Sequence, residues 1–388
     1  MRIVDVCAFY TAHGGGVKTY IDRKFAAASI AGHEMVVIAP GARDEVIELG
    51  PGQILATIAS PQLALDRRYR YFANEPALHR ALDHWRPDFV EASSPWSSAS
   101  MVARWEGSAP RSLVMHADPL AAYAYRWFGR LADIATIDHH FDRFWQHLRR
   151  LDARFNHVIS ASANLTNRLV AGGLQRATTI AMGVEPGIFS PAHRDLELRR
   201  RMLALCGLDS DATLMLGVGR YSAEKRWGMV IDAVQSAGAE IPIGLVLIGD
   251  GRARRALVAH AAGSPHIMVG APIRERHLLA ATMASADALI HGCEAETFCM
   301  VAAEARASGL PIIVPDRGGA ADHVTQGASR HFAAADGSAL RNSIVDFARH
   351  AIAPGEYGAA YPVRTMDQHF DQLFDLYGAH AASKCRAA

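Results

Sequence analysis

The chain has 388 residues, of which 50% are hydrophobic and 20% are charged, and its formal net charge is +1. This is the composition of a globular protein, and the length suits two domains of ordinary size rather than a single core. The near-neutral charge gives no indication of a nucleic-acid partner, and no apolar run is long enough to be a membrane span.

The N-terminus and the cysteines indicate a cytoplasmic protein. The start, MRIVDVCAFYTAHGGG, enters a strand pattern at once and lacks the apolar region of a signal peptide. The five cysteines are scattered and form no CxxC pair, which predicts reduced thiols. The 19 histidines suggest a metal site, but His139, His140 and His147 do not have a usual ligand spacing, so we expect no zinc.

Short β-branched segments alternate with longer amphipathic segments along the whole chain. The predicted strands of the first half are RIVDVCAF, EMVVIAP, ILATIA, DFVEASS, SLVMHA, HVISAS and TTIAMGV. Those of the second half are LMLGVGR, GLVLIGD, HIMVGA, ALIHG and PIIVPD. This alternation is typical of parallel βαβ units and predicts an α/β protein with two Rossmann-like, doubly wound domains.

A turn-rich and then charged segment, PGIFSPAHRDLELRRRMLALCGLDSD, separates the two halves and predicts a hinge near residues 184–210. We therefore expect an N-terminal domain over residues 1–185 and a C-terminal domain over residues 186–364. An amphipathic helix over about residues 365–380 is expected to pack back on the first domain. Two such domains facing a cleft would bring the carboxyl ends of both sets of strands to one ligand site.

A glycine-rich turn follows the first predicted strand and precedes the first predicted helix. Gly14, Gly15 and Gly16 can adopt conformations that other residues avoid, and they let a ligand approach the main chain. The N–H groups at the start of the helix could then bind an anion. The turn is neither GxGxxG nor a Walker A loop, so a plain tight turn is an equally good interpretation.

Two cations follow the first strand of the second half. In GVGRYSAEKRW, Arg220 and Lys225 are five residues apart across a turn, where a guanidinium and an ammonium could bind a diphosphate. The spacing alone also fits two solvated surface cations. Two further glycine turns, in LIGDG and at Gly318-Gly319, strengthen the interpretation as a phosphate site.

The segment GCEAETFCMVAAEARASGLPIIVPDRGGAADHV carries Glu296, seven residues and Glu304, then a Gly-x-Pro strand and a Gly-Gly turn. It resembles the signature of the retaining glycosyltransferases of family four, or glycosyl transferases group 1, which have the GT-B fold. The resemblance extends to GRYSAEKRW, LIGDG, GGGVKTYIDRKFAAASIAGHEMVVIAP, MHADP, ISAS and MGVEPGIFSP, and so covers almost the whole chain in the right order.

The resemblance implies roles for individual residues. In the second domain, Glu304 would accept the ribose hydroxyls of a sugar nucleotide, and Glu296 would lie beside the donor sugar. Arg220 and Lys225 would hold the diphosphate. Backbone N–H groups would bind sugar or phosphate oxygens at Thr297, Phe298 and Cys299.

In the first domain, which would bind the acceptor, the resemblance implies that His116 lies near the reacting face of the donor sugar. His116 could also be an ordinary core histidine at a strand end. Gly15 and Gly16 would lie against the phosphates. The donor would be a UDP- or GDP-linked hexose, and no metal cofactor is expected, because protein cations take over its task.

The chain departs from the family pattern at two places. Cys299 stands where the family commonly has glycine, which adds bulk near the sugar. Asp322 stands near the position of a usual glutamate, and we give it no role. The single D-x-D, Asp209-Ser210-Asp211, lies before a predicted strand and is interpreted as a turn.

The stretch from Tyr123 to Phe155 interleaves aromatic residues with arginines that include Arg126, Arg130, Arg143 and Arg149. It predicts one or two helices with a buried face of Trp127, Leu131, Ile134, Phe141, Trp145 and Leu148. The alternative is an anionic membrane surface, which would suit a lipid-linked or glycan acceptor at the inner face of the cytoplasmic membrane.

Three functions compete. The first is a retaining transferase that moves a hexose from a nucleotide sugar to an acceptor. A sugar-nucleotide epimerase of the same architecture would need paired acid and base carboxylates. A non-catalytic sugar-nucleotide-binding protein is disfavoured by the complete set of Arg220, Lys225, Glu296 and Glu304.

Overall fold

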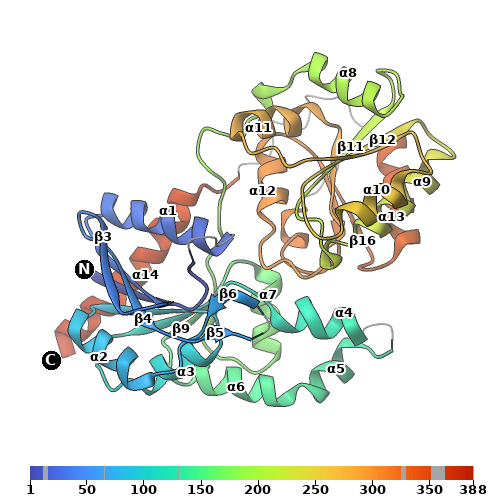
Figure 1. The fold of residues 1–388 in the computed structure, drawn as a ribbon. Coiled ribbons are helices and arrows are strands. Elements are labelled where there is room, and N and C mark those ends of the chain that lie inside the picture. The colour runs from blue at the N-terminus through green and yellow to red at the C-terminus, as the bar shows by residue number, and fades with distance from the viewer. Residues whose placement is uncertain (12–15, 65, 129–130, 325–328, 351–362, 388) are drawn as a thin grey trace. The chain divides into compact units, whose positions relative to one another are not determined.

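The computed structural model describes residues 1–11, 16–64, 66–128, 131–324, 329–350 and 363–387 (Figure 1). The chain forms two compact units. One comprises Met1–Asp118, Trp127–Ala181 and Asp367–Ala388, and the other comprises Pro119–Arg126 and Met182–Met366. The predicted residues Gly14, Gly15 and Arg130 lie outside the described residues.

The first unit is built on an eight-stranded sheet, among the described residues, with the order β10-β9-β8-β7-β1-β2-β4-β3. The strands are β1 (Arg2–Cys7), β2 (Glu34–Gly41), β3 (Glu45–Gly50), β4 (Gln53–Ala59), β7 (Phe89–Ser93), β8 (Arg111–Met115), β9 (His157–Ser160) and β10 (Ala177–Thr179). All neighbours pair in parallel except β3 and β4, which are antiparallel. The short strands β5 (Gln62–Leu63) and β6 (Asp66–Arg70) form a separate ribbon.

Helices form most of the connections between the parallel strands of the first unit. They are α1 (Gly16–Ile30), α2 (Glu75–Trp85), α3 (Ser97–Arg104), α5 (Ile134–His140), α6 (Asp142–Asp152) and α7 (Ala163–Ala171). Between α3 and α5 lie the π-helix η1 (Leu120–Ala124) and the short α4 (Tyr125–Phe128), of which the residues up to Arg126 belong to the second unit. The last helix, α14 (Met366–Ala387), is longer than the predicted segment, and its residues from Asp367 onward belong to the first unit.

The second unit has a six-stranded parallel sheet, in the part of the chain that the structure describes, with the order β13-β12-β11-β14-β15-β16. Its strands are β11 (Thr213–Val218), β12 (Ile243–Ile248), β13 (Ile267–Gly270), β14 (Ala288–Ile290), β15 (Ile312–Pro315) and β16 (Arg330–Phe332). Its helices are α8 (Leu196–Leu205), α9 (Trp227–Gly238), α10 (Arg254–Ala261), α11 (Arg276–Ser285), α12 (Met300–Ala307) and α13 (Gly337–Arg349). This strand order is that of a Rossmann fold.

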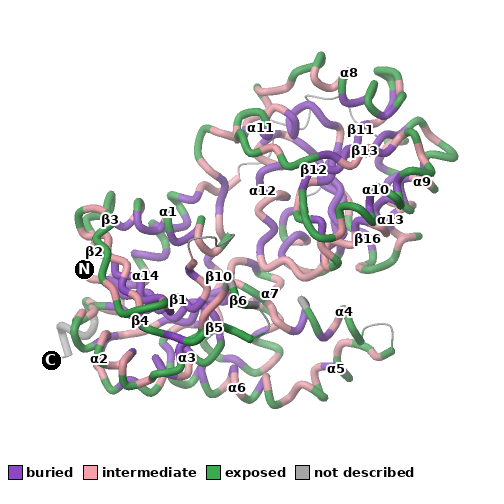
Figure 2. The backbone as a smooth tube through the Cα atoms, viewed as in Figure 1, coloured by how far each residue is buried: buried purple, intermediate pink, exposed green. Residues whose placement is uncertain are grey.

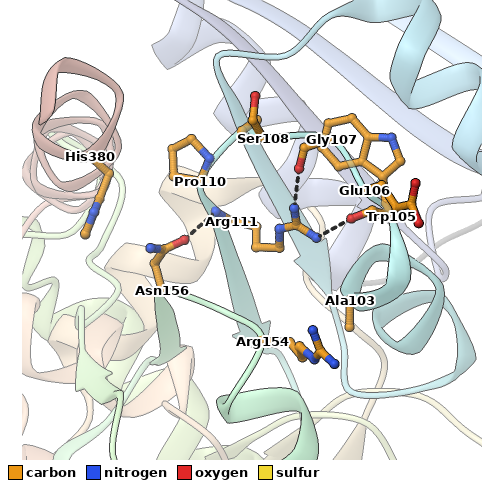
Figure 3. A pocket seen from close by; sticks show the side chains of 11 residues that line it. Ala103, Trp105, Glu106, Gly107, Ser108, Pro110, Arg111, Arg154, Asn156 and His380 are labelled. Atoms are coloured by element: carbon orange, nitrogen blue, oxygen red, sulfur yellow. Dashed lines mark hydrogen bonds between the residues drawn. The ribbon is translucent and has the colours of Figure 1, made fainter. Parts of the chain in front are cut away.

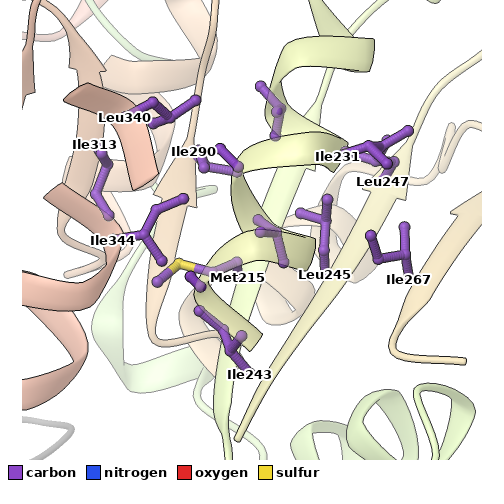
Figure 4. Packing of buried hydrophobic residues seen from close by; sticks show 14 of the residues in the cluster. Met215, Ile231, Ile243, Leu245, Leu247, Ile267, Ile290, Ile313, Leu340 and Ile344 are labelled. Carbon is purple, nitrogen blue, oxygen red and sulfur yellow. The ribbon is translucent and has the colours of Figure 1, made fainter. Parts of the chain in front are cut away.

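Both faces of the second sheet are covered, because alternate strand residues point to opposite faces. Met215, Leu245 and Leu247 pack with residues of α9, α10 and α13, such as Ile231 and Leu340 (Figure 4). Their strand neighbours pack with residues of α8, α11 and α12 on the other face. The central strands of both sheets, such as β1, β7, β11 and β12, are among the most buried parts of the described chain (Figure 2).

One predicted buried face is wrong in part. Trp145 and Leu148 are buried in α6, as predicted. Trp127 and Leu131 are 59% and 84% exposed, because the chain here forms the short helix α4 and a turn rather than one continuous amphipathic helix. Among the described residues, no helix is both long enough and apolar enough to cross a bilayer.

Candidate active site

Each sheet has a topological switch point, at which the order of its parallel strands changes direction. In the second unit the change lies between β11 and β14, and in the first unit it lies between β1 and β7. Ligands of doubly wound sheets bind outside the carboxyl ends of the strands at such switch points. The residues that follow these four strands are therefore the first to inspect.

After β11 the chain makes a compact turn that holds Lys225 in place. The indole Nε1 of Trp227 donates to the carbonyl of Arg220 at 2.9 Å, and Trp227 is buried. The short 3-10 helix η3 (Ala223–Lys225) ends at Arg226, whose φ of 51° reverses the chain before α9. Arg226 in turn is ion-paired with Glu294, in the segment that follows β14. The turn after β11 is thus fastened to the loop after β14.

Two basic side chains lie against Glu296, one from the turn after β11 and one from the end of β14. Lys225 Nζ forms an ion pair with Glu296 Oε1, and His291 Nε2 lies 3.2 Å from the same oxygen. Burial alone would raise the pKa of Glu296, but His291 and the Lys225 charge hold that pKa well below its usual range. Burial lowers the pKa of His291, against the opposing effect of Glu296. The site therefore holds an ionised carboxylate beside a neutral imidazole.

His291 is a candidate site residue that the sequence reasoning did not predict. It is fully buried and directly follows β14, so it occupies the switch point itself. A polar residue at the end of an apolar run such as ALIHG is the signal that could have identified it. Its position next to Glu296 depends on the path of the loop, which the sequence does not reveal.

The two predicted diphosphate cations differ in their environment. The side chain of Lys225 is 13% exposed, whereas that of Arg220 is 81% exposed and lies 3.5 Å from Glu224 Oε1. Burial alone would lower the pKa of Lys225, but the attraction of Glu296 outweighs this effect. The pKa of Lys225 is therefore raised, and the side chain is an ammonium. Lys225 therefore belongs to the Glu296 site, whereas Arg220 extends into solvent.

The Gly318-Gly319 turn supports the loop from Glu296 to Phe298. Gly319 N donates to the Glu296 carbonyl at 2.6 Å. A Cβ at Gly319 would lie 2.5 Å from the backbone of Thr297 and Phe298, and Gly318 has a φ of +82°. On the other side, His323 Nε2 contacts the Phe298 carbonyl at 2.6 Å. Only glycine permits this close backbone approach, so the turn fixes the loop whose N–H groups were predicted to face the ligand.

Glu304 lies within α12 and is only 7% exposed, so it is not an ordinary surface carboxylate. Arg276, at the start of α11, donates to Glu304 Oε1 at 2.7 Å and lies 3.5 Å from Glu185. The helix between the two signature glutamates begins only at Met300, so Glu296 belongs to the preceding loop and Glu304 to the helix. Sequence reasoning did not predict Arg276 as the partner of Glu304.

Cys299 has a backbone conformation that glycine adopts without strain, which explains why the family pattern commonly has glycine at this position. Its φ of 68° and ψ of 72° lie in the left-handed region, and it caps the N-terminus of α12. This conformation costs a non-glycine residue about 1–2 kcal/mol. Burial raises the pKa of the Cys299 thiol well above its ordinary value, so the group is a neutral thiol near Glu296. Such strain is kept at sites where the surrounding structure enforces it.

The strain at Cys299 gives a stability prediction. Cys299→Gly should be more stable to urea than Cys299→Ala by about 0.5–1 kcal/mol, because both variants lose the thiol but only alanine keeps the strain. Ala302 is the matched control, since it is buried in the same helix at an ordinary position. Ala302→Gly should lose about 1 kcal/mol instead. Equal stabilities of the two Cys299 variants would contradict the assignment of strain.

In the first unit, His116 follows β8 and Ser93 ends β7, so both lie near its switch point. His116 Nε2 lies 3.3 Å from Ser93 Oγ, and the ring packs edge-on against Tyr20 with centroids 5.0 Å apart. Burial lowers the pKa of His116 to about 4. Gly16 is the first residue of α1. His116 is therefore a neutral imidazole at the carboxyl end of the sheet.

A separate cavity of about 430 Å³ lies elsewhere in the first unit (Figure 3). Arg111 forms part of its wall and donates to the carbonyls of Trp105 and Gly107. Arg111 is the first residue of β8, and His116 follows its last residue. The cavity therefore lies at the amino ends of the strands, whereas His116 lies at their carboxyl ends. Residues predicted to bind the donor do not line it.

Comparison with known proteins gives a family match for each half of the chain. Residues 14–187 match the model of Glycosyltransferase Family 4, and residues 206–347 match that of Glycosyl transferases group 1. A GDP-mannose-dependent alpha-(1-6)-phosphatidylinositol dimannoside mannosyltransferase of Mycobacterium tuberculosis is 29% identical over 323 residues, which are 81% of this chain and 79% of the relative. A GDP-mannose-dependent alpha-mannosyltransferase of Corynebacterium glutamicum is 27% identical over 332 residues, 84% of this chain and 75% of the relative.

The fold also has close structural neighbours. Sucrose-phosphate synthase from Thermosynechococcus elongatus superposes with a TM-score of 0.68 at 18% identity, over 100% of this chain and 97% of the neighbour. The starch synthase IV catalytic domain from Arabidopsis thaliana gives the same TM-score at 16% identity, over 98% and 99% of the two chains. With both family models matched in order along the chain, the protein belongs to the retaining, nucleotide-sugar-dependent glycosyltransferases of family four, which have the GT-B fold.

Proposed function

We propose that this protein transfers a mannosyl residue from GDP-mannose to a lipid-linked glycan acceptor and forms an α linkage. The observation that carries the proposal is the Glu296 site, where Lys225 and His291 hold an ionised carboxylate inside the family signature. The choice of donor rests on the mannosyltransferases of Mycobacterium tuberculosis and Corynebacterium glutamicum, which are named as GDP-mannose-dependent.

Each residue then has a distinct task. Glu304 accepts hydrogen bonds from the ribose hydroxyls, and Arg276 shares the carboxylate or moves aside when the nucleotide binds. Glu296 binds the donor sugar. Lys225 and Arg220 neutralise charge that develops on the departing diphosphate, which is where fixed charges lower a barrier most. Sugar or phosphate oxygens accept from backbone N–H groups at Thr297, Phe298 and Cys299.

A sugar-nucleotide epimerase is not favoured. That reaction needs a carboxyl group that can donate a proton, whereas Glu296 is held in its ionised form by Lys225 and His291. The same arrangement suits a transferase, in which the carboxylate has only to accept hydrogen bonds and the phosphate itself assists the attack.

We also propose that the reaction needs no metal ion. Among the described residues, His291, Glu296 and Cys299 each offer one possible ligand atom within 4.8 Å of one another. Lys225 already engages the Glu296 oxygen nearest His291, and the Cys299 thiol keeps its proton. A neutral thiol is a poor ligand, and an ammonium at the same oxygen repels a cation. Protein cations therefore replace the metal.

An exposed apolar segment of the first unit supports a lipid-linked acceptor at a membrane surface. The exposed apolar side chains of Trp127, Phe128 and Leu131 lie together in sequence, beside a stretch rich in arginine. Aromatic rings with neighbouring cations suit the headgroup region of an anionic bilayer. We propose peripheral attachment at the cytoplasmic face, where a lipid-linked acceptor would be presented.

One assay tests the proposal. The protein is incubated with vesicles of anionic lipid that contain a phosphatidylinositol mannoside, together with labelled GDP-mannose or, in parallel, UDP-glucose. We expect label to enter the lipid fraction only from GDP-mannose, and equally in the presence of EDTA. Flotation of the vesicles should carry the protein at low salt and release it at high salt, because surface attraction is screened.

The arms of the assay fail separately. Transfer from UDP-glucose but not from GDP-mannose would contradict the proposed donor. Loss of transfer in EDTA would contradict the proposal that the reaction needs no metal ion. Transfer without flotation would remove the membrane from the proposal. A Trp127→Ser, Leu131→Ser variant should transfer to a detergent-dispersed acceptor at the normal rate but should not float.

A further inference from the structure

Three charged side chains meet in the core of the first unit. Asp5 of β1 and Glu91 of β7 are direct cross-strand partners in the parallel register, so their carboxylates lie on one face of the sheet. Lys24 of α1 lies between them, with Nζ 3.0 Å from Asp5 Oδ2 and in contact with Glu91 Oε2. All three side chains are fully buried.

Hydrogen bonds complete this charge cluster of Asp5, Lys24 and Glu91. Ser93 Oγ donates to Asp5 Oδ1 at 2.9 Å, and the Tyr377 hydroxyl of α14 donates to Glu91. Burial raises the pKa of Asp5 to about 7, with Glu91 adding to the rise and Lys24 opposing it. Burying three charges is expensive, and apolar residues of similar volume are often no less stable. A core function alone does not account for the cluster.

Ser93 connects the cluster to His116. Its hydroxyl carries one proton, and carboxylate oxygens lie within reach at Asp5 and, at 3.3 Å, at Glu91. Whether or not Asp5 is protonated, the Ser93 hydroxyl proton can therefore be donated to a carboxylate oxygen of Asp5 or Glu91. The Ser93 oxygen is then left as an acceptor for His116 Nε2, 3.3 Å away. Since His116 is neutral, a proton on Nε2 places the lone pair on Nδ1.

We propose that Ser93, anchored by the Asp5–Lys24–Glu91 cluster, is a positioning residue that fixes the ring orientation and the Nε2-protonated tautomer of His116. The proposal rests on the proposed transferase function and on the place near the reacting face of the donor sugar that the family resemblance implies for His116. It assigns the cluster a purpose: a hydroxyl held by buried charges cannot rotate, so it keeps the imidazole in one of its two tautomers. In functional histidines, a hydrogen bond to one ring nitrogen fixes both the ring orientation and the tautomer.

Activity measurements test the coupling. Ser93→Ala should lower kcat on the order of tenfold, the value of one hydrogen bond of about 1.4 kcal/mol, with donor KM nearly unchanged. Ser93→Thr keeps the hydroxyl and should restore most of the loss. In a His116→Ala background, Ser93→Ala should have no further effect, because the residue acts only through the ring.

Ser160→Ala is the matched control. Ser160 ends β9 of the same sheet, is equally buried, and bonds to Ser162 and Thr166 rather than to His116. Its variant should keep kcat. If Ser93→Ala behaves like Ser160→Ala, or if the Ser93 and His116 effects multiply, the positioning role is overturned.

A spectroscopic readout separates this inference from the proposed function. Nitrogen-15 NMR of the labelled protein should show His116 protonated on Nε2 alone, and Ser93→Ala should shift it to a mixture of tautomers. An Nδ1-protonated ring in the wild type would overturn the inference even with normal activity. Unchanged kcat in His116→Ala would instead overturn the role of His116, while the tautomer would still report on Ser93.

Discussion

Replacing Lys225 with alanine should lower kcat by roughly 10²–10³-fold. The ammonium is mostly buried and lies against Glu296, where it can meet the charge that develops on the leaving diphosphate. Removing one such preorganised group typically raises a barrier by about 3–4 kcal/mol. The loss should fall mainly on kcat, because the interaction strengthens as charge develops. Steady-state kinetics with GDP-mannose measures it.

The control for Lys225 is a cation of similar exposure that the site does not use. Arg341 forms an ion pair with Glu240 in the same unit, and its side chain is also partly buried. Arg341→Ala should keep kcat within about twofold, since a partly exposed ion pair with Glu240 contributes little and involves no residue of the candidate site. If Lys225→Ala retains normal turnover, the lysine has no part in neutralising the leaving group.

Replacing Lys24 with methionine should destabilise the protein by about 3–5 kcal/mol. The ammonium is the single cation of the Asp5–Lys24–Glu91 cluster, and its loss leaves Asp5 and Glu91 side by side without a counter-charge. Breaking a buried ion pair from one side has a cost of this size, because the remaining charge cannot be hydrated. Urea denaturation followed by circular dichroism measures the change.

A triple variant provides the matched comparison. Asp5→Asn, Lys24→Met and Glu91→Gln together remove every charge of the cluster while keeping acceptors for Ser93 and Tyr377. This variant should regain most of the stability that Lys24→Met loses, since no unpaired charge is left. A Lys24→Met protein within about 1 kcal/mol of wild type would show that the cluster has another source of stabilisation.

The α/β architecture could be predicted because parallel strands are nearly continuous apolar runs. Segments such as LMLGVGR and GLVLIGD became the central strands β11 and β12. The strands β3 and β16 were missed, because edge strands are only partly buried and need no apolar run. β3 is mostly exposed, and β16 reads Arg-His-Phe. Their pairing partners, not their own sequences, make them strands.

The candidate site could be predicted only as far as its motif extends. The signature placed Glu296, Glu304 and Lys225, and the structure brings Glu296 and Lys225 together. His291 and Arg276 were not predicted, because their contacts depend on loop paths and helix packing. The inward placement of Trp127 and Leu131 was wrong, since Trp127 lies in the short helix α4 and Leu131 follows it outside any helix, and both side chains are exposed.

Cys299 shows how a departure from a pattern gains a physical meaning. From the sequence it was an added side chain near the sugar. The structure adds that its backbone has the left-handed conformation for which glycine is the unstrained residue. The strain could not be inferred from composition or spacing, because φ depends on how the loop joins α12.

The anomeric configuration of the transfer product tests the central claim most directly. Proton NMR of the mannosylated acceptor, formed from GDP-mannose without metal and purified at once, distinguishes an α from a β linkage at the new anomeric centre. In the proposed reaction, Lys225 and Arg220 stabilise the departing diphosphate beside the ionised Glu296, and the anomeric configuration of the donor is retained. The α-mannoside is therefore expected as the sole product. A β-mannoside would show inversion and would contradict the account of the site.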